Sequence, residues 1–224
     1  MSRSASGWGG LLDRLPEAVR DRLLTEAHRI EVPRGGVVYR SGDPPRCVLV
    51  TAGLLRVFLT SPQGRQVTVR HARPGELLGV AAAVAGPSQV GVQALLDSGL
   101  LLFSAAALSR EARRDAQVAW AVAEEVSQRL YEAMSQIAAN AFGSVRERLA
   151  RELLDSAVPG KQGTLVVHAT QQQLAEAVGS AREVVARTLR SFREEGLVRT
   201  RPGGLVLSGA EALVRIGAGE LTQG

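Results

Sequence analysis

Between Val32 and Phe103 the chain alternates short apolar, β-branched runs with turn residues, and this pattern constrains the fold more than any other feature. The runs are VVYR, CVLVTAG, LLRVFLT, QVTVRH, VGVQALL and GLLLF, with Gly, Pro or Asp between them. A spacing of about 8 to 12 residues is typical of antiparallel sandwiches and barrels. The apolar segment GELLGVAAAVAG predicts a short helix between two strands, and residues 11–30 predict an amphipathic helix before the sheet.

A second stretch, from Arg110 to Phe142, contains neither Gly nor Pro and predicts one long helix. Its apolar stripe consists of Val118, Val122, Val126, Leu130, Ala133 and Ile137. A helix of about 30 residues is about 45 Å long, which is more than one small β domain can cover. We therefore expect part of the stripe to contact a second copy of the chain, and the alternative is a helix that lies wholly on its own domain.

The segment after Gly143 contains three candidate capping boxes, in which an N-cap Ser or Thr is followed three residues later by Glu or Gln. The pairs are Ser144 with Glu147, Thr170 with Gln173, and Ser180 with Glu183. A loop (158–163) and the short strand TLVVH separate the first two helices, and LVRTRPGGLVL predicts a β-hairpin after the third. Two helices joined by a tight turn at Gly179 and followed by a hairpin predict a winged helix-turn-helix, whose second helix enters the DNA major groove.

The second helix of this motif has two different faces. Val185, Thr188, Leu189 and Phe192 are spaced to face the core together with Leu174, Val178 and Leu197, whereas the opposite face holds Arg182, Glu183, Ala186, Arg187 and Arg190. Guanidinium groups bind guanine edges and a carboxylate accepts from the cytosine amino group, so we expect Arg182, Glu183 and Arg187 to contact bases. We also expect Glu183 to serve the cap at Ser180. Arg190 is expected at a phosphate.

Together these patterns predict an α+β protein with three parts: an N-terminal antiparallel, jelly-roll-like β-roll (1–109), a long dimerisation helix (110–142) and a C-terminal winged helix-turn-helix (143–224). The formal charge of +5 favours a polyanionic partner without establishing one. No apolar run approaches the length of a membrane span, so we expect a cytoplasmic protein without a membrane partner.

The composition also bears on cofactors and catalysis. One cysteine excludes an intrachain disulfide and a cysteine-ligated iron-sulfur cluster. Cys47, His28, His71 and His168 show no ligand spacing, so we expect a buried cysteine, surface histidines, no metal site and no haem. The sequence contains no nucleophile, base and orienting group at a spacing typical of catalytic sites, and it contains no phosphate-binding loop. We therefore do not expect an enzyme.

Two long segments resemble the CRP/FNR transcription regulators. TQQQLAEAVGSAREVVARTLRSFREEGLV is similar to the family's helix-turn-helix pattern, and PRGGVVYRSGDPPRCVLVTAGLLRV is similar to its β-roll signature of the cyclic-nucleotide-binding type. The resemblance covers nearly the whole chain. It implies a homodimeric regulator of double-stranded DNA that recognises a palindrome of TGTGA-like half-sites.

The resemblance also implies roles for individual residues. Arg182, Glu183 and Arg187 fall on the base-reading positions, and phosphate contacts are expected from Thr170, Gln171, Gln172, Ser180 and Arg190. The loop at 158–163 resembles the polymerase-contacting region, so we expect an activator with RNA polymerase as a partner. The alternative is a β-roll sensor module that regulates a partner protein through its C-terminal winged helix.

The effector region departs from family members that bind cyclic AMP. The Gly75-Glu76 pair is present, but Ser88 and Gln89 stand where those members have an Arg-Ser pair, and no arginine lies between Arg73 and Arg110. Ala133 and Met134, which would meet the adenine, lack hydroxyl groups. Because burying a phosphate without a guanidinium partner is costly, we expect cyclic AMP not to be the effector. We expect Glu76 to cap the short helix.

Overall fold

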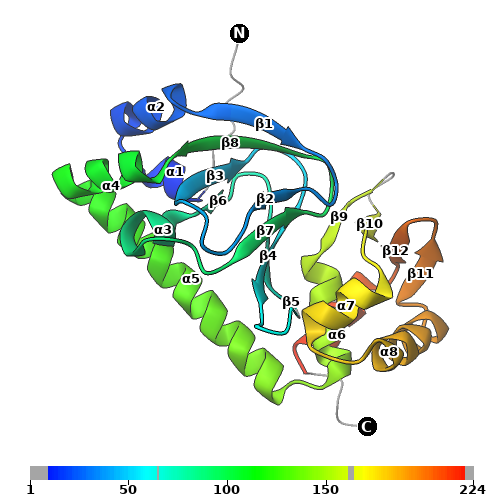
Figure 1. Ribbon diagram of the computed structural model, residues 1–224. Helices are drawn as coiled ribbons and strands as arrows, with labels where there is room; N and C mark the ends of the chain where they lie inside the picture. The colour runs from blue at the N-terminus through cyan, green and yellow to red at the C-terminus, as the bar shows by residue number, and fades with distance from the viewer. Residues whose placement is uncertain (1–9, 65, 161–163, 220–224) are drawn as a thin grey trace. The chain divides into compact units, whose positions relative to one another are not determined.

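The computed structural model describes residues 10–64, 66–160 and 164–219 and shows an α+β protein (Figure 1). Its internal contacts divide the chain into two compact units, residues 1–57 with 72–132 and residues 58–71 with 133–224. The first unit is mainly antiparallel sheet, and the second contains a helix-turn-helix. The predicted fold class is therefore confirmed.

Within the described residues, eight short strands lie between His28 and Ser104, as the punctuated sequence predicts. They are β1 (His28–Val32), β2 (Val37–Tyr39), β3 (Arg46–Val50), β4 (Leu55–Thr60), β5 (Gln66–Ala72), β6 (Leu77–Leu78), β7 (Gly91–Ala94) and β8 (Ser98–Ser104). One sheet has the order β1-β8-β3-β6 and the other β2-β7-β4-β5. Inward-facing side chains such as Val48, Leu55 and Leu100 form the core between them. The short helix α3 (Val80–Ala85) lies between β6 and β7, as predicted.

The prediction of one amphipathic helix over residues 11–30 is wrong. The structure has α1 (Gly10–Arg14), α2 (Glu17–Thr25) and then β1 from His28. Pro16, the N-cap of α2, separates the two helices because its ring cannot continue a preceding helix. The leucines of α1 are buried against the first part of the long helix, so tertiary packing stabilises this short segment.

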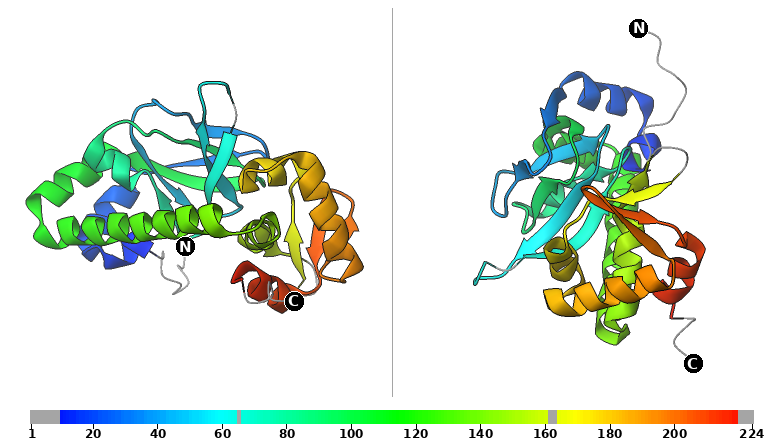
Figure 2. Two further views of the ribbon diagram at one scale, coloured as in Figure 1. Left: turned by 90° about the horizontal axis from the view of Figure 1, so that it is seen from below. Right: turned by 90° about the vertical axis from the view of Figure 1, so that its right-hand side faces the viewer.

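The prediction of an unbroken helix from Arg110 is also wrong. Helix α4 (Ala105–Arg114) ends at Asp115, and α5 (Ala116–Phe142) starts directly after it. Asp115 has an extended backbone conformation, and its Oδ1 accepts from the amide of Gln117 at 2.8 Å. A side chain that caps the next helix in this way competes with helical continuation. Beyond this break, α5 runs as one continuous helix (Figure 2).

The apolar stripe of α5 divides into a covered and an exposed part. Val118 and Val122 are buried against α1 and α4 within the same chain. Burial of these two side chains therefore does not require contact with a second copy of the chain. From Val126 onward the larger side chains of the stripe are exposed, with Leu130 58% and Ile137 68% solvent-accessible, and Ala133 is half-buried. The expected contact with a second copy therefore concerns the second half of the stripe.

The second unit contains the predicted winged helix-turn-helix. Its elements are α6 (Val145–Asp155), β9 (Ala157–Pro159), β10 (Leu165–Val167), α7 (Gln171–Val178), α8 (Arg182–Glu194), β11 (Val198–Arg201), β12 (Gly204–Leu207) and α9 (Ala210–Gly217). The predicted loop at 158–163 is partly wrong, because Val158 and Pro159 belong to β9, which pairs with β10; residues 161–163 lie outside the described residues. Helix α9 was not predicted.

Buried side chains from α6, α7, α8 and the small sheet form a single core in this unit. Leu149 and Leu153 of α6 meet Leu174 of α7 and Phe192 of α8, and all four are almost fully buried. The guanidinium of Arg146 lies 4.8 Å from the centroid of the Phe192 ring and forms an ion pair with Glu195. Hydrogen bonds from Arg146 and Ser191 lower the pKa of Glu195. Helices α6 and α8 are thus joined by both apolar and charged contacts.

Candidate nucleic-acid interface

The turn between α7 and α8 sets the direction of the second helix. Gly179 ends α7 with φ of 61°, in the left-handed region that glycine adopts without a steric penalty. The amides of Gly179 and Ser180 both donate to the carbonyl of Ala175. Ser180 and Ala181 separate Gly179 from the first residue of α8, Arg182, which is the tight turn predicted from the sequence.

The third predicted capping box, Ser180 with Glu183, is wrong. Helix α8 starts one residue later, with Ala181 as its N-cap and no side-chain cap. The amides of Val184 and Val185 donate to the carbonyl of Ala181, while the amide of Ser180 is engaged at the end of α7. The turn therefore shifts the helix start. Glu183 has no capping role, and its exposed carboxylate stands in the first turn of α8.

The two predicted faces of α8 are present. Val185, Leu189 and Phe192 are buried, whereas Arg182, Glu183, Arg187 and Arg190 are exposed. Thr188 lies between the two faces and donates its hydroxyl to the carbonyl of Val184 at 2.9 Å. One face of α8 is thus used entirely for the core, and the other presents three arginines and a carboxylate to solvent.

The start of α7 carries the second predicted capping box, which is confirmed. Thr170 Oγ1 accepts from the amide of Gln173 at 3.2 Å, and Gln173 Oε1 accepts from the amide of Thr170 at 2.8 Å. The first box, Ser144 with Glu147, is also confirmed at the start of α6. In α7, Gln171 is half-buried and Gln172 is exposed. The first-turn amides of a helix favour an anion, so this end of α7 suits a phosphate.

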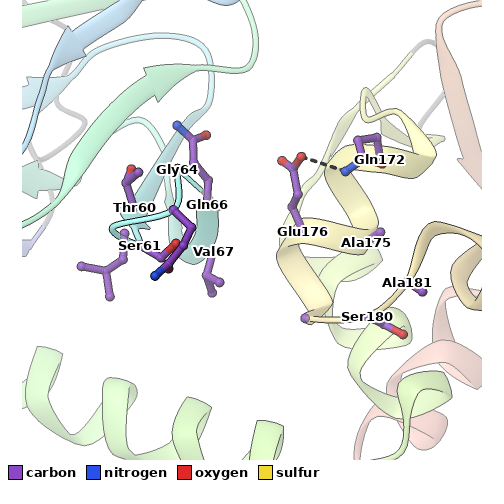
Figure 3. A pocket seen from close by; sticks show the side chains of 13 residues that line it. Thr60, Ser61, Gly64, Gln66, Val67, Gln172, Ala175, Glu176, Ser180 and Ala181 are labelled. Atoms are coloured by element: carbon purple, nitrogen blue, oxygen red, sulfur yellow. Dashed lines mark hydrogen bonds between the residues drawn. The ribbon is translucent and has the colours of Figure 1, made fainter.

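A pocket in the second unit contains two of the predicted phosphate-contacting residues. Its described lining comes from the β4–β5 hairpin, including Thr60 and Gln66 at the strand ends, and from α7 and the turn after it, including Gln172 and Ser180 (Figure 3). Gln172 Nε2 donates to Glu176 Oε1 at 3.0 Å along the same helix. The one charged side chain in this described lining is the carboxylate of Glu176, so the described lining offers no cation to a nucleotide phosphate.

The basic surface of α8 continues onto the wing, which reasoning from the sequence did not identify. Arg193 follows Arg190 by three residues, and its Nη1 lies 3.4 Å from Thr200 Oγ1 on β11. Arg199 and Arg201 on β11 are exposed, and Arg201 pairs with Gly204, which has no side chain to cover it. The sequence signal for this surface was the alternation of Arg199, Thr200 and Arg201 in a predicted strand, because residues two apart in a strand lie on the same face.

The predicted effector residues have other partners in the structure. Glu76 does not cap α3, whose N-cap is Gly79; instead Glu76 Oε1 accepts from the amide of Arg73, and Oε2 lies 3.4 Å from Arg129 Nη2. Ser88 Oγ accepts from the amide of Val90, and Gln89 is exposed. On α5, Ala133 is half-buried and Met134 is exposed.

Arg129 is surrounded by carboxylates. Its Nε donates to Glu125 at 2.9 Å and its Nη1 to Glu132 at 2.9 Å, in addition to the pair with Glu76. Glu125 is only 3% exposed and also binds Arg14 of α1. Burial lowers the pKa of Arg129, but the bond to Glu132 and the neighbouring carboxylate charges raise it more, so the net pKa shift is upward. The cation next to Glu76 is therefore already neutralised by acidic groups.

Comparison with known proteins shows what these two units resemble. The Crp-like helix-turn-helix domain matches residues 147–216, and the cyclic nucleotide-binding domain matches residues 29–115. The cyclic AMP receptor protein of Thermus thermophilus is 32% identical over 211 residues, which cover 91% of this chain and 94% of that protein. The chain belongs to the CRP/FNR family. As a CRP/FNR regulator it is a transcription regulator with a helix-turn-helix DNA-binding domain, and it is not an enzyme.

Further relatives agree with this assignment. The transcriptional regulator LdrP of T. thermophilus is 30% identical over 75% of this chain and 85% of its own length. The cAMP-activated global transcriptional regulator Vfr of Pseudomonas aeruginosa is 25% identical over 84% of this chain and 93% of its own length. A solved CRP/FNR-family regulator from T. thermophilus superposes with a TM-score of 0.70 at 27% identity, covering 85% of this chain and 98% of that one.

The histidines and the cysteine of this CRP/FNR regulator do not form a cluster. The side chain of His71 is only 5% exposed, contrary to the prediction of a surface histidine, and its Nε2 lies 3.5 Å from Glu152 Oε1. Burial raises the pKa of the Cys47 thiol to about 12, so Cys47 is a neutral thiol at pH 7 and not the thiolate that binds metals. Among the described residues, no three His, Cys, Asp or Glu side chains are arranged to hold a metal ion.

Within residues 10–64, 66–160 and 164–219, none of the helices is both long and apolar enough to cross a membrane. A cytoplasmic location stays a prediction.

Proposed function

We propose that this CRP/FNR regulator binds, as a homodimer, an interrupted palindrome with TGTGA-like half-sites about one helical turn (~34 Å) apart. The observation that carries the proposal is the exposed face of α8, where Arg182, Glu183 and Arg187 stand opposite a fully buried face. These side chains match the donors and the acceptor that major-groove base edges require. The start of α7, with Thr170, Gln171 and Gln172, supplies amides for the flanking phosphate.

Binding to a synthetic duplex tests this proposal. Fluorescence anisotropy of a labelled TGTGA palindrome is compared with the same duplex after one half-site, or both, has been scrambled, at one fixed salt concentration. We expect the palindrome to bind at least about 10³-fold more tightly than the doubly scrambled duplex, as sequence-specific regulators do. Equal affinity for the palindrome and the doubly scrambled duplex would contradict the proposal.

The wing adds a sequence-independent contribution to the same interface. Arg193 is half-buried and links α8 to β11 through Thr200, and Arg199 and Arg201 on β11 are exposed. Phosphate contacts of this kind position a protein on DNA and supply salt-dependent affinity without reading sequence. Arg201 lies next to the turn of the hairpin. We assign it to a DNA phosphate beyond the bases that α8 contacts.

The dimer interface in this proposal is the second half of α5. Its exposed apolar side chains are Val126, Leu130, Met134 and Ile137, with Trp120, Tyr131 and Phe142 also exposed along the helix. A contiguous apolar surface of this kind marks an interaction site in a water-soluble chain. Two copies related by a two-fold axis bury the same stripe twice and present two α8 helices to the two half-sites.

We further propose that cyclic AMP is not the effector, although some named relatives are activated by it. Ser88 and Gln89 bring no positive charge, and Arg129 already binds Glu76, Glu125 and Glu132. A cyclic phosphate placed here would lack an uncommitted guanidinium partner, and a buried anion without one is unstable by several kcal/mol.

Calorimetry with cyclic AMP tests this second proposal. We expect no submicromolar binding to the wild type. The double variant S88R/Q89S introduces the missing Arg-Ser pair, and we expect it to bind cyclic AMP more tightly than the wild type because it adds a bidentate phosphate partner. Submicromolar binding by the unmodified chain would show that the effector proposal is wrong.

Activation of transcription through RNA polymerase completes the proposal. It is supported by the resemblance of the 158–163 segment to the polymerase-contacting region of the family, of which Val158 and Pro159 lie in β9. Transcription in vitro from a promoter that carries the palindrome upstream distinguishes activation from repression.

A further inference from the structure

Arg148 of α6 hydrogen-bonds the backbone at two places that are far apart in the sequence. Its Nε donates to the carbonyl of Val178 at 2.9 Å, and its Nη1 donates to the carbonyl of Gly143 at 2.6 Å. Val178 is the last residue of α7, and Gly143 directly follows the last residue of α5. One half-buried guanidinium thus joins the end of the long helix to the end of the first helix of the helix-turn-helix.

These two carbonyls are strong acceptors for a cation. The last carbonyls of a helix have no partner within the helix, and the helix dipole makes that end attractive to positive charge. Hydrogen bonds from a guanidinium are among the strong ones, and its planar fork holds two acceptors in a fixed relation. The positions of Val178 and Gly143 are therefore coupled through one rigid group.

The carbonyl of Val178 lies next to the turn that directs α8. Gly179 follows it in the left-handed conformation, and α8 begins three residues later at Arg182. At the other end of the connection, Ser144 caps α6 immediately after Gly143, and its carbonyl accepts from the amide of Arg148. A change in the backbone at the end of α5 can therefore reach the turn through Arg148.

We infer that Arg148 is a positioning residue for DNA binding, which sets the direction of α8 with respect to the end of α5. Arg148 acts through the Gly179 turn and does not itself read bases. The inference rests on the proposed DNA-binding function, which it deepens by naming a residue that controls how the reading helix is presented.

Arg151 provides a matched control on the same helix. Its Nη1 donates to the carbonyl of Gly217, the last residue of α9, also at 2.6 Å. Replacing Arg151 by alanine removes a charged hydrogen bond to the end of α9, and replacing Arg148 removes those to Val178 and Gly143, all within the same unit. Among the described contacts, Arg148 reaches the residue before the turn between α7 and α8, whereas Arg151 reaches the end of α9. A purely structural role therefore predicts that any loss of DNA affinity follows the loss of thermal stability in both R148A and R151A.

The experiment compares full-length wild type, R148A, R148K and R151A in three measurements: melting temperature, anisotropy titration with the palindromic and scrambled duplexes, and amide hydrogen exchange without DNA. We expect R148A to bind the palindrome at least about tenfold more weakly than R151A, which corresponds to about 1.4 kcal/mol. Affinity for the scrambled duplex should be equal in the two variants, because no phosphate contact is removed.

Hydrogen exchange measures the positioning role directly. Amides from the turn and the first part of α8 (residues 179–185) should exchange faster in R148A than in R151A at matched thermal stability, because local opening of that segment becomes easier. R148K should be intermediate, since one ammonium group does not reproduce the two-acceptor fork. If R148A does not fold, R148K replaces it in the comparison with R151A.

The outcomes separate the inference from the function on which it rests. If R148A and R151A lose affinity equally and exchange equally in this segment, the positioning role of Arg148 is wrong. If the wild type itself does not distinguish the two duplexes, the proposed function fails, while the exchange comparison still decides whether Arg148 controls the turn.

Discussion

Replacing Arg182 by alanine is expected to weaken binding of the palindrome by about 1 to 3 kcal/mol for each half-site, because a bidentate guanine contact is lost. Since a dimer carries the substitution twice, the two losses add when the half-sites are independent. Arg182 is exposed at the start of α8, and the truncation leaves the buried face with Val185 and Leu189 unchanged, so folding should not be affected. Anisotropy titrations on the palindrome and on single-base variants measure the loss and the relaxed specificity.

The matched control for this prediction is Arg201→Ala on the wing. Arg201 is also exposed, but it is assigned to a phosphate, so its loss should weaken binding to all duplexes to a similar extent. The slope of log affinity against log salt should fall by about one for each phosphate contact removed. If R182A weakens binding to scrambled DNA as much as binding to the palindrome, Arg182 does not read a base.

Replacing Ile137 by glutamate is expected to convert the proposed dimer into monomers and to reduce affinity for the palindrome by about 10² to 10⁴-fold. The side chain is 68% exposed in the single chain, so a charge there is tolerated by the fold but is costly to bury in a dimer interface. The second half-site then no longer benefits from the high effective concentration that the dimer provides. Sedimentation measures the mass, and anisotropy measures the affinity.

Val84→Glu serves as the control for this substitution. Val84 lies on α3 and is 65% exposed, close to the value for Ile137, so the same change is made at an equally exposed apolar position outside α5. We expect V84E to sediment as the wild type does and to keep its affinity. A dimeric I137E protein with unchanged DNA affinity would rule out the second half of α5 as the interface.

Local rules explain how far the sequence predicted this protein. Strand and helix periodicity, the capping boxes at Ser144 and Thr170 and the turn at Gly179 depend on residues within a few positions of each other. From these features the positions of the β-roll strands, α7, α8 and the wing were predicted. The exposed arginines of α8 followed from the predicted position of that helix. The same rules failed where a near neighbour competed for the same backbone group. Ser180 has the capping-box spacing, but its amide is bonded at the end of α7, so α8 starts at Arg182.

The sequence by itself determined the α+β class, the winged helix-turn-helix and the exposed, arginine-bearing side of α8, because each is encoded by side-chain period and by residues with strong local preferences. Only the tertiary structure decided that Val118 and Val122 are covered within the chain, that Glu76 pairs with Arg129, and that Arg148 joins the end of α5 to the end of α7. These contacts join residues that are far apart in the chain. A long arginine side chain can reach many carbonyls and carboxylates, and folding brings only certain ones within hydrogen-bonding distance.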